Sequence, residues 1–198
     1  MIIRDIKSTS NAGSALLAYF YFDFKDKEKQ DLRALLSSLL IQLSDQSDIF
    51  FDILFSLYSV HKKAAETPTD DSLAKCLKDM LTITGQVPIY LVIDALDECP
   101  NDTGIPPPRE KVLEFVKELI KLHPNLRLCI TSRPEFDIRA TLDPLAAQQV
   151  SLHDEKGQKQ DIIDYVTSIL HSDSKMKKWR DVDKNMVVEK LSEKADGM

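Results

Sequence analysis

The chain has 198 residues, of which 43% are hydrophobic, and a formal net charge of −6 at pH 7. This length and apolar content are enough for one packed domain, or for one domain and part of a second. The acidic balance argues against a nucleic-acid-binding protein, which normally presents a basic face.

Other features predict a cytoplasmic protein without a membrane partner. The longest apolar run, residues 15–22, is too short to cross a bilayer. The first residues lack the basic start and the long apolar stretch of a signal peptide. The three cysteines show no CxxC metal spacing, and their odd number fits buried, reduced thiols better than a disulfide framework.

The first part of the chain predicts one strand followed by three helices. Residues 1–8 carry isoleucines at helical spacing and are typical of the last turns of a helix. Residues 15–24 are mostly apolar and aromatic, which predicts a strand covered on both faces. Apolar residues recur at helical spacing in residues 31–43, 48–60 and 69–81, so each segment predicts a helix with a buried face.

The middle of the chain predicts two buried strands with a helix between them. Residues 89–93 are consecutively apolar or aromatic, a run that is short for a helix and rich in β-branched types. Residues 100–108 include three consecutive prolines and predict a stiff loop. A helix is expected over residues 109–122 and a short strand over residues 126–130.

The last part of the chain predicts mostly helices. Residues 136–145 favour a short helix or turn, and residues 148–152 favour a weak strand. Two further helices are expected over residues 158–171 and 182–195. Because strands alternate with helices, the whole pattern predicts an α/β fold, a three-layer sandwich in which helices cover both faces of a mostly parallel sheet.

A cluster of carboxylates ends the strand at residues 89–93. Asp94 follows the strand directly, and Asp97 and Glu98 come just after it. Magnesium prefers hard oxygen ligands and usually takes one or two carboxylates together with waters and substrate phosphates. The cluster is therefore a candidate magnesium site; the competing interpretation is that Asp94 and Asp97 only cap the next turn.

A second polar group ends the strand at residues 126–130, where Thr131, Ser132 and Arg133 follow it. Ligands of parallel α/β sheets bind at the carboxyl ends of the strands, so both groups are expected beside one crevice. An arginine there can sense or neutralise a phosphate. The alternative for Arg133 is an ordinary surface salt bridge.

Four stretches taken together resemble a known family. They are the Tyr-Phe-Tyr-Phe-Asp-Phe of residues 19–24, the leucine-rich helix from Asp31, the Leu-Val-Ile-Asp-Ala-Leu-Asp-Glu-Cys of residues 91–99, and the Leu-Cys-Ile-Thr-Ser-Arg of residues 128–133. In this order they resemble a NACHT-type NTPase domain of the STAND class, in the fungal group related to the nephrocystin-3 N-terminal region. The third stretch matches that family's Walker B motif, and the fourth matches its sensor 1.

The resemblance implies specific roles. Asp94 would hold Mg²⁺ through water, Asp97 and Glu98 would orient or deprotonate the attacking water, and Arg133 would sense the γ-phosphate of ATP or GTP. Members of this family use the nucleotide as a slow signalling switch for oligomerisation, as in innate immunity, often between an effector and a repeat region. Mg²⁺ and ATP or GTP are thus expected in the full-length context, with protein partners through self-association or adjacent domains.

One departure from the family is decisive: the 198 residues contain no GxxxxGK[ST]. The backbone amides and lysine of that loop do most of the triphosphate binding. We therefore expect the chain to start just after the phosphate loop, with residues 1–152 as a partial NTPase core and residues 153–198 as the start of a truncated helical subdomain. By itself it should bind little or no nucleotide and catalyse no turnover.

The resemblance also predicts which strands this chain contributes to the sheet, because the family's first strand comes before the phosphate loop and is not expected in these residues. By resemblance the full order is 5-1-4-3-2, so this chain should retain a three-stranded core of residues 15–24, 89–93 and 126–130. Residues 148–152 should then be detached from the sheet or moved beside the strand at 126–130.

Three functions compete at this stage. The first is a fragment of a nucleotide-switched signalling NTPase. The second is a protein-interaction module that keeps the fold but works without a nucleotide. The third is a different Mg²⁺ enzyme, such as a receiver-like phosphoacceptor, which the sequence supports least because no matching lysine completes its pocket.

Overall fold

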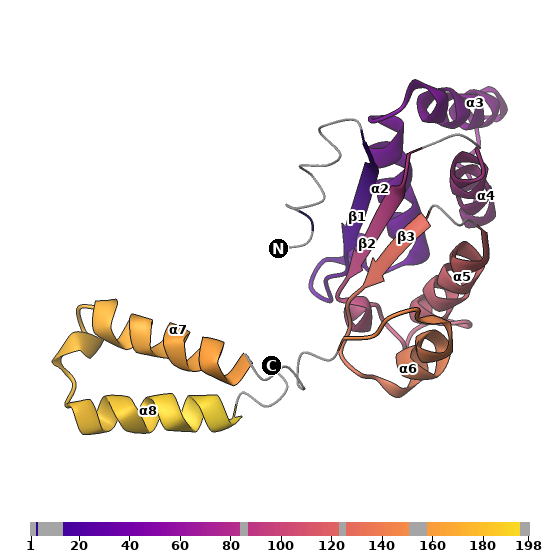
Figure 1. Ribbon diagram of the computed structural model, residues 1–198. Helices are drawn as coiled ribbons and strands as arrows, with labels where there is room; N and C mark the ends of the chain where they lie inside the picture. The colour runs from indigo at the N-terminus through magenta and orange to yellow at the C-terminus, as the bar shows by residue number, and fades with distance from the viewer. Residues whose placement is uncertain (1–2, 4–13, 84–86, 123–125, 151–157, 195–198) are drawn as a thin grey trace. The chain divides into compact units, whose positions relative to one another are not determined.

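The computed structural model describes residue 3 and residues 14–83, 87–122, 126–150 and 158–194. The chain divides into two compact units, residues 1–146 and residues 147–198 (Figure 1). The first unit contains the sheet, and the second contains a pair of helices. The domain boundary expected near residue 152 and, apart from residue 3, the helix end expected over residues 1–8 lie outside the described residues.

The sheet of the first unit has three parallel strands in the order β1-β2-β3. They are β1 (Leu16–Tyr21), β2 (Ile89–Asp94) and β3 (Leu126–Ile130) (Figure 1). In the register, Leu91 of β2 lies opposite Ala18 on one side and Leu128 on the other. The three predicted core strands and their order are therefore confirmed.

The weak strand predicted over residues 148–152 is wrong for the part that the structure describes, and the expected detachment of this segment from the sheet is confirmed for residues 148–150. Residues 148–150 form no strand and are exposed, and residues 151–152 lie outside the described residues. Val150 is an apolar side chain that stays 61% exposed. The segment has no buried surface to pack against, so its β-branched residue does not place it in the sheet.

Four helices of the first unit match the predicted helical segments, and a fifth matches the short helix or turn expected over residues 136–145. They are α2 (Leu32–Ser44), α3 (Asp48–Ala64), α4 (Asp70–Leu81), α5 (Pro108–Leu122) and α6 (Phe136–Leu142). Two have side-chain caps that lie just before the apolar stripe: the Asp31 carboxylate accepts from the Ala34 amide, and the Thr69 hydroxyl accepts from the Ser72 amide. Three short 3-10 helices lie between these elements, η1 (Lys27–Lys29), η2 (Leu96–Glu98) and η3 (Asp143–Leu145).

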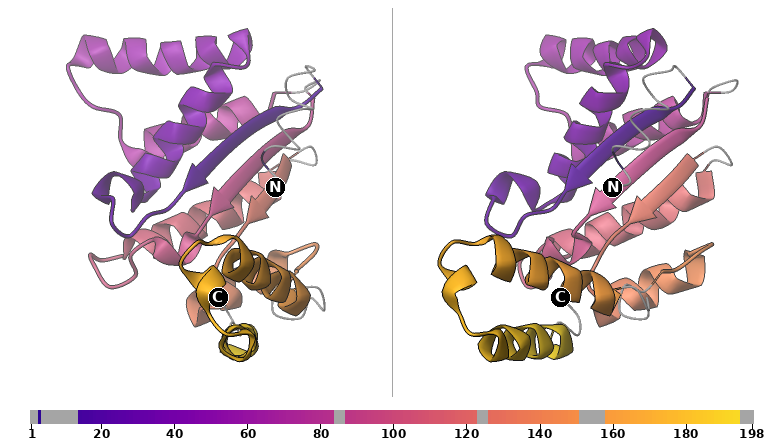
Figure 2. Two further views of the ribbon diagram at one scale, coloured as in Figure 1. Left: turned by 90° about the vertical axis from the view of Figure 1, so that its left-hand side faces the viewer. Right: turned by 60° about the vertical axis from the view of Figure 1, so that its left-hand side comes forward.

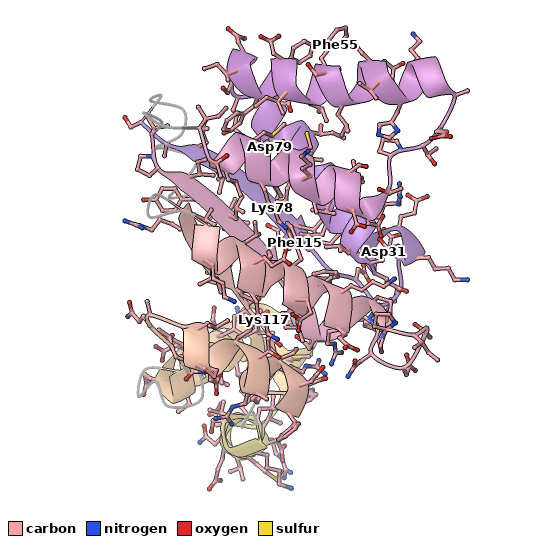
Figure 3. All side chains as sticks on the ribbon, turned by 90° about the vertical axis from the view of Figure 1, so that its right-hand side faces the viewer. Asp31, Phe55, Lys78, Asp79, Phe115 and Lys117 are labelled. Atoms are coloured by element: carbon pink, nitrogen blue, oxygen red, sulfur yellow. The ribbon has the colours of Figure 1, made fainter. Side chains whose placement is uncertain are left out.

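The core lies between the sheet and these helices. Alternate strand residues such as Phe20, Leu91 and Ile93 face the leucines of α2 and the apolar stripes of α4 and α5. Figures 2 and 3 show the helices of the first unit on one face of the sheet and beside β1. Within this layer, Lys78 of α4 lies over the Phe115 ring of α5. Among the described residues of the first unit no helical layer covers the opposite face, so the α/β class is confirmed but the predicted three-layer sandwich is not.

The outer edge of β1 is capped by two glutamine side chains, Gln42 from α2 and Gln46 from the turn that follows it. The Gln46 amide accepts from the Leu17 N–H at 3.0 Å and donates to the Leu17 carbonyl at 2.7 Å. The Gln42 amide makes the same pair of bonds with Tyr19, at 3.1 and 2.7 Å. A carboxamide has the donor and acceptor of a peptide group, so the two glutamines, one helical turn apart, occupy the place of a further strand.

The second unit contains α7 (Gln158–Ser172), η4 (Met176–Lys178) and α8 (Asp181–Lys194). The two helices match the predicted segments to within one residue at each end. They pack against each other along their length (Figure 1). In the described part of the chain, every helix is too short or too polar to cross a bilayer.

The glutamine cap generates the first prediction. Replacing Gln42 by Ala should lower the free energy of unfolding of the first unit by about 1–3 kcal/mol, because two hydrogen bonds to partly buried strand groups are lost. Amide hydrogen exchange of β2 measures this quantity for the first unit alone. The control is Lys111→Ala, an exposed position of α5, which should change it by less than about 0.5 kcal/mol. An equal effect of both variants would contradict the role of the cap.

Candidate functional site

The carboxyl ends of β2 and β3 are joined through Thr131. Its amide donates to the Ile93 carbonyl at 3.0 Å, and its own carbonyl accepts from Leu96 N–H at 3.0 Å. Its hydroxyl donates to the Asp94 carboxylate and accepts from the Ala95 amide. One residue therefore fixes the position of the Asp94 carboxylate at the sheet edge.

The chain reverses sharply at Ala95, which allows the acidic segment to fold back on the strand ends. Ala95 has a φ of 55°, a left-handed conformation that is unusual for a residue with a Cβ. The turn leads into η2, which carries Asp97 and Glu98. Strained conformations of this kind concentrate at functional sites, where the surrounding contacts hold them in place.

Asp97 and Arg133 are brought together as the sequence predicted for two neighbouring strand ends. The Asp97 carboxylate accepts from the Arg133 amide at 3.0 Å and lies 3.5 Å from its guanidinium Nε. The two side chains differ in exposure, 9% for Asp97 and 79% for Arg133. Asp97 is thus fixed within the structure, whereas the Arg133 guanidinium extends into solvent.

Glu98 connects the same edge to the end of β1. Its Oε2 accepts from the Phe24 amide at 3.2 Å, beyond the last residue of that strand. The four residues singled out from the sequence, Asp94, Asp97, Glu98 and Arg133, thus come from the carboxyl ends of β2 and β3, and Glu98 ties in β1. Asp97 contacts Arg133 directly, whereas Asp94 is bonded to Thr131.

Arg109 is a central residue that the sequence did not reveal. Its side chain is only 6% exposed, and it donates to the Asp97 and Cys99 carbonyls. The same guanidinium pairs with Glu135 and, at 3.4 Å, with Asp137. It therefore links the loop after β2 to the segment after β3. The only available signal was its place directly after the prolines, which marks a helix start but not a buried cation.

An open cleft of about 460 Å³ lies at this edge of the sheet. Its lining residues come from the ends of the strands and the following loops: Phe24, Asp97, Glu98, Cys99, Pro100, Asn101, Asp102, Arg109, Arg133 and Glu135. Four of these side chains are carboxylates and two are guanidinium groups, of which Arg109 is already paired. The lining therefore favours a cation or a cation-bound ligand over a free anion.

Two observations bear on a metal at this site. Among the described residues, no group of three or more histidines, cysteines and acids is arranged to hold a metal ion. The Asp94 carboxylate and the Thr131 hydroxyl are nevertheless hard oxygen donors, and magnesium is commonly held by one carboxylate with waters and phosphates supplying the rest. The donor chemistry fits Mg²⁺ held through water, and does not fit a closed structural metal site.

Cys99 lines the cleft as a buried free thiol. Burial raises the pKa of its thiol to about 12, and the nearby Arg109 charge offsets only part of that rise. Its Sγ donates to the Gln30 carbonyl at 3.3 Å. Burial likewise raises the pKa of Cys76, in the helical core, to about 11. Because the thiolate is the reactive form, the raised pKa keeps Cys99 in its unreactive thiol form at neutral pH.

Replacement of Arg109 by Ala should be strongly destabilising. Two buried carbonyls and two carboxylates lose their donor, which should cost about 2–5 kcal/mol in the free energy of unfolding. Urea unfolding followed by the amides of β2 measures the loss. The matched control, Arg139→Ala, removes an exposed pair with Asp143 and should change the value by less than about 1 kcal/mol. Similar losses in both variants would show that the buried guanidinium of Arg109 contributes no more to stability than an exposed arginine does.

The raised pKa values predict protected thiols. At pH 8 the fraction of Cys99 thiolate should be roughly a thousandfold below that of an ordinary cysteine, because its pKa is raised from 9.0 to about 12. Iodoacetamide labelling of the native protein, quantified by mass spectrometry, should modify Cys129 first, since it is less buried. All three cysteines should react once the chain is unfolded. Fast native labelling of Cys99 would contradict its burial.

Comparisons with known proteins extend these observations. A protein-family model described as "Nephrocystin 3, N-terminal" matches residues 1–133, which include all three strands and the residues of both strand-end motifs. The search of curated proteins found no match, and the search of solved structures found none either.

Proposed function

The chain belongs to the nephrocystin-3 N-terminal family, and from this premise we propose that its strand-end site is the metal and γ-phosphate side of a nucleotide-binding switch of the NACHT and STAND type. The observation that supports this most is the Thr131 junction, which holds the Asp94 carboxylate at the carboxyl end of β2 beside the end of β3. Parallel α/β sheets bind ligands at this edge.

Each residue of the site has a proposed task. Asp94 holds a hydrated Mg²⁺, with Thr131 fixing the orientation of its carboxylate. Glu98 is held at the cleft wall by the Phe24 amide, where its carboxylate can accept a hydrogen bond from the attacking water. Arg133 contacts the γ-phosphate through its exposed guanidinium. Asp97, already bonded to Arg133, positions that arginine and so takes a supporting role in orienting the water.

The site should bind ATP or GTP weakly in these 198 residues. They contain no GxxxxGK[ST], so the backbone amides and the lysine of that loop are not supplied by this stretch. Each charge-assisted hydrogen bond that is missing removes about 1.5–3 kcal/mol of binding. The excess of carboxylates in the cleft lowers the affinity for a free triphosphate further. We propose that these residues form only one side of the nucleotide-binding site of a switch domain, and that this side is inactive by itself.

A second candidate function is a protein-interaction module that works without a nucleotide. One observation favours it: α3 presents three aromatic side chains to solvent, Phe51, Phe55 and Tyr58. Exposed aromatic clusters of this kind commonly mark a binding surface. The two candidates differ in whether Asp94 matters for metal binding.

The test uses Mn²⁺ as a paramagnetic substitute for Mg²⁺. Substoichiometric MnCl₂ added to the ¹⁵N-labelled chain should broaden the amides of residues 94–98 and 131–133 more than those of other acidic segments. Asp94→Asn keeps the shape and the acceptor for Thr131 but removes the charge, and should abolish the local broadening. Asp71→Asn, at the exposed start of α4, should leave it unchanged.

The same spectra separate the two candidates. If broadening is uniform over all acidic segments, or persists in Asp94→Asn, the metal site is ruled out and the interaction module is favoured. Adding ATP with Mg²⁺ should shift the same amides only at high nucleotide concentration, and Arg133→Ala should weaken that response.

A further inference from the structure

The outer face of α3 carries a stripe that its own fold does not use. The inner side of the helix packs on the core through Phe50, Ile53, Leu54 and Leu57. Farther round the helix, Phe51, Phe55 and Tyr58 are each 55% exposed. Phe51 and Phe55 stack on each other with ring centroids 6.1 Å apart. Figure 3 shows α3 at the outside of the helical layer, with Phe55 on the side turned away from α4.

The ends of this stripe carry opposite charges. Asp48 lies seven residues before Phe55 and Lys62 lies seven residues after it, so both are on the same face of the helix. Both are exposed, and Lys62 lies over the Tyr58 ring at 5.5 Å. The outer face therefore runs from two acids, Asp48 and the exposed Asp52, past the aromatic rings to a base. Asp48 and Lys62 are at equal distances from Phe55 along the chain.

The charge pattern of this face matches that of a second copy of the helix when the second copy runs antiparallel to the first. If a two-fold axis passes near Phe55, Asp48 of one copy faces Lys62 of the other at both ends of the contact, and the aromatic rings meet between them. An isologous contact of this kind closes after two copies. A parallel arrangement would place like charges opposite each other at both ends, which is unfavourable. The charge pattern thus identifies a second copy of the chain as the occupant.

We propose that two copies of the chain associate through antiparallel packing of their α3 helices, centred on Phe55. At about 150–250 Å² for a fully buried aromatic ring, six half-exposed rings bury roughly 600 Å² in total, and flanking residues add to this. That size belongs to weak, concentration-dependent interfaces rather than to obligate dimers. The contact lies on α3, which contributes no residue to the strand-end cleft, so it does not rest on nucleotide binding.

Sedimentation velocity of the intact chain over a series of micromolar concentrations tests the proposal. The wild-type chain should show a concentration-dependent shift from monomer to dimer. Phe55→Asp places two like charges at the axis and should weaken the dimer at least about tenfold. The matched control is Phe136→Asp on α6, where the phenylalanine is 89% exposed but lies outside the stripe; it should leave the dimer unchanged.

A charge exchange tests the antiparallel direction. Asp48→Lys and Lys62→Asp should each weaken the dimer about fivefold, since each replaces two attractive pairs by two repulsive ones. The double variant restores opposite charges at both ends and should recover the wild-type affinity to within about twofold. Far-UV circular dichroism checks that α3 stays folded, because both exchanges oppose the helix dipole.

Three outcomes would overturn the proposal. A wild-type chain that stays monomeric shows that the stripe is not filled by a second copy. Equal weakening by Phe55→Asp and Phe136→Asp shows that association does not depend on α3. A double variant as weak as the single ones, while still folded, shows that Asp48 and Lys62 do not face each other.

Discussion

The buried guanidinium of Arg109 is the contact on which the geometry of the strand ends depends. The loop after β2 turns the carbonyls of Asp97 and Cys99 inward, away from any ladder that could pair with them. Buried carbonyls require donors, and a guanidinium offers five in a planar fork. One side chain thus satisfies the β2 loop and binds Glu135 after β3 at the same time.

This contact explains why Asp97 and Arg133 meet. Asp97 has its backbone held by Arg109 and its carboxylate held by Arg133. Its position is set from the interior of the protein, whereas the guanidinium of Arg133 is tied only at its base and points outward. The site therefore combines a buried, fixed carboxylate with a guanidinium that is open to solvent.

The sequence predicted the parts of this structure that depend on local periodicity. The continuous apolar run of β2, bounded by Pro88 and Asp94, could only be a short buried strand, and its acids had to emerge at the carboxyl edge. The order of the three strands came from the family resemblance rather than from the periodicity. The strand-end residues were found because their position relative to a strand is itself a sequence property.

Other features were invisible because they depend on tertiary contacts. Gln42 near the end of α2 and Gln46 in the turn after it are four residues apart, a spacing that is equally typical of a solvated helix face. A buried arginine such as Arg109 has the same local sequence context as an exposed one. The apolar periodicity of residues 48–60 predicted a helix with a buried face, but it carried no information about the exposed rings of Phe51, Phe55 and Tyr58. Helices on both faces of the sheet were expected only because strands alternate with helices along the chain. That alternation indicates how the elements are connected, but not which face of the sheet each helix covers.

The capping of β1 by glutamines leaves only one edge of the sheet available for pairing with a further strand. At the β1 edge, the Leu17 and Tyr19 peptide groups are already hydrogen-bonded to carboxamides. A further strand can pair with this edge only if the two glutamine side chains are displaced first. On the other side, no strand flanks β3 within the described residues. Any strand that enlarges this sheet, whether from the same polypeptide or from another, must therefore add beside β3, next to the carboxyl end that carries Thr131 and Arg133. Extension of the sheet and completion of the cleft would then occur at the same border.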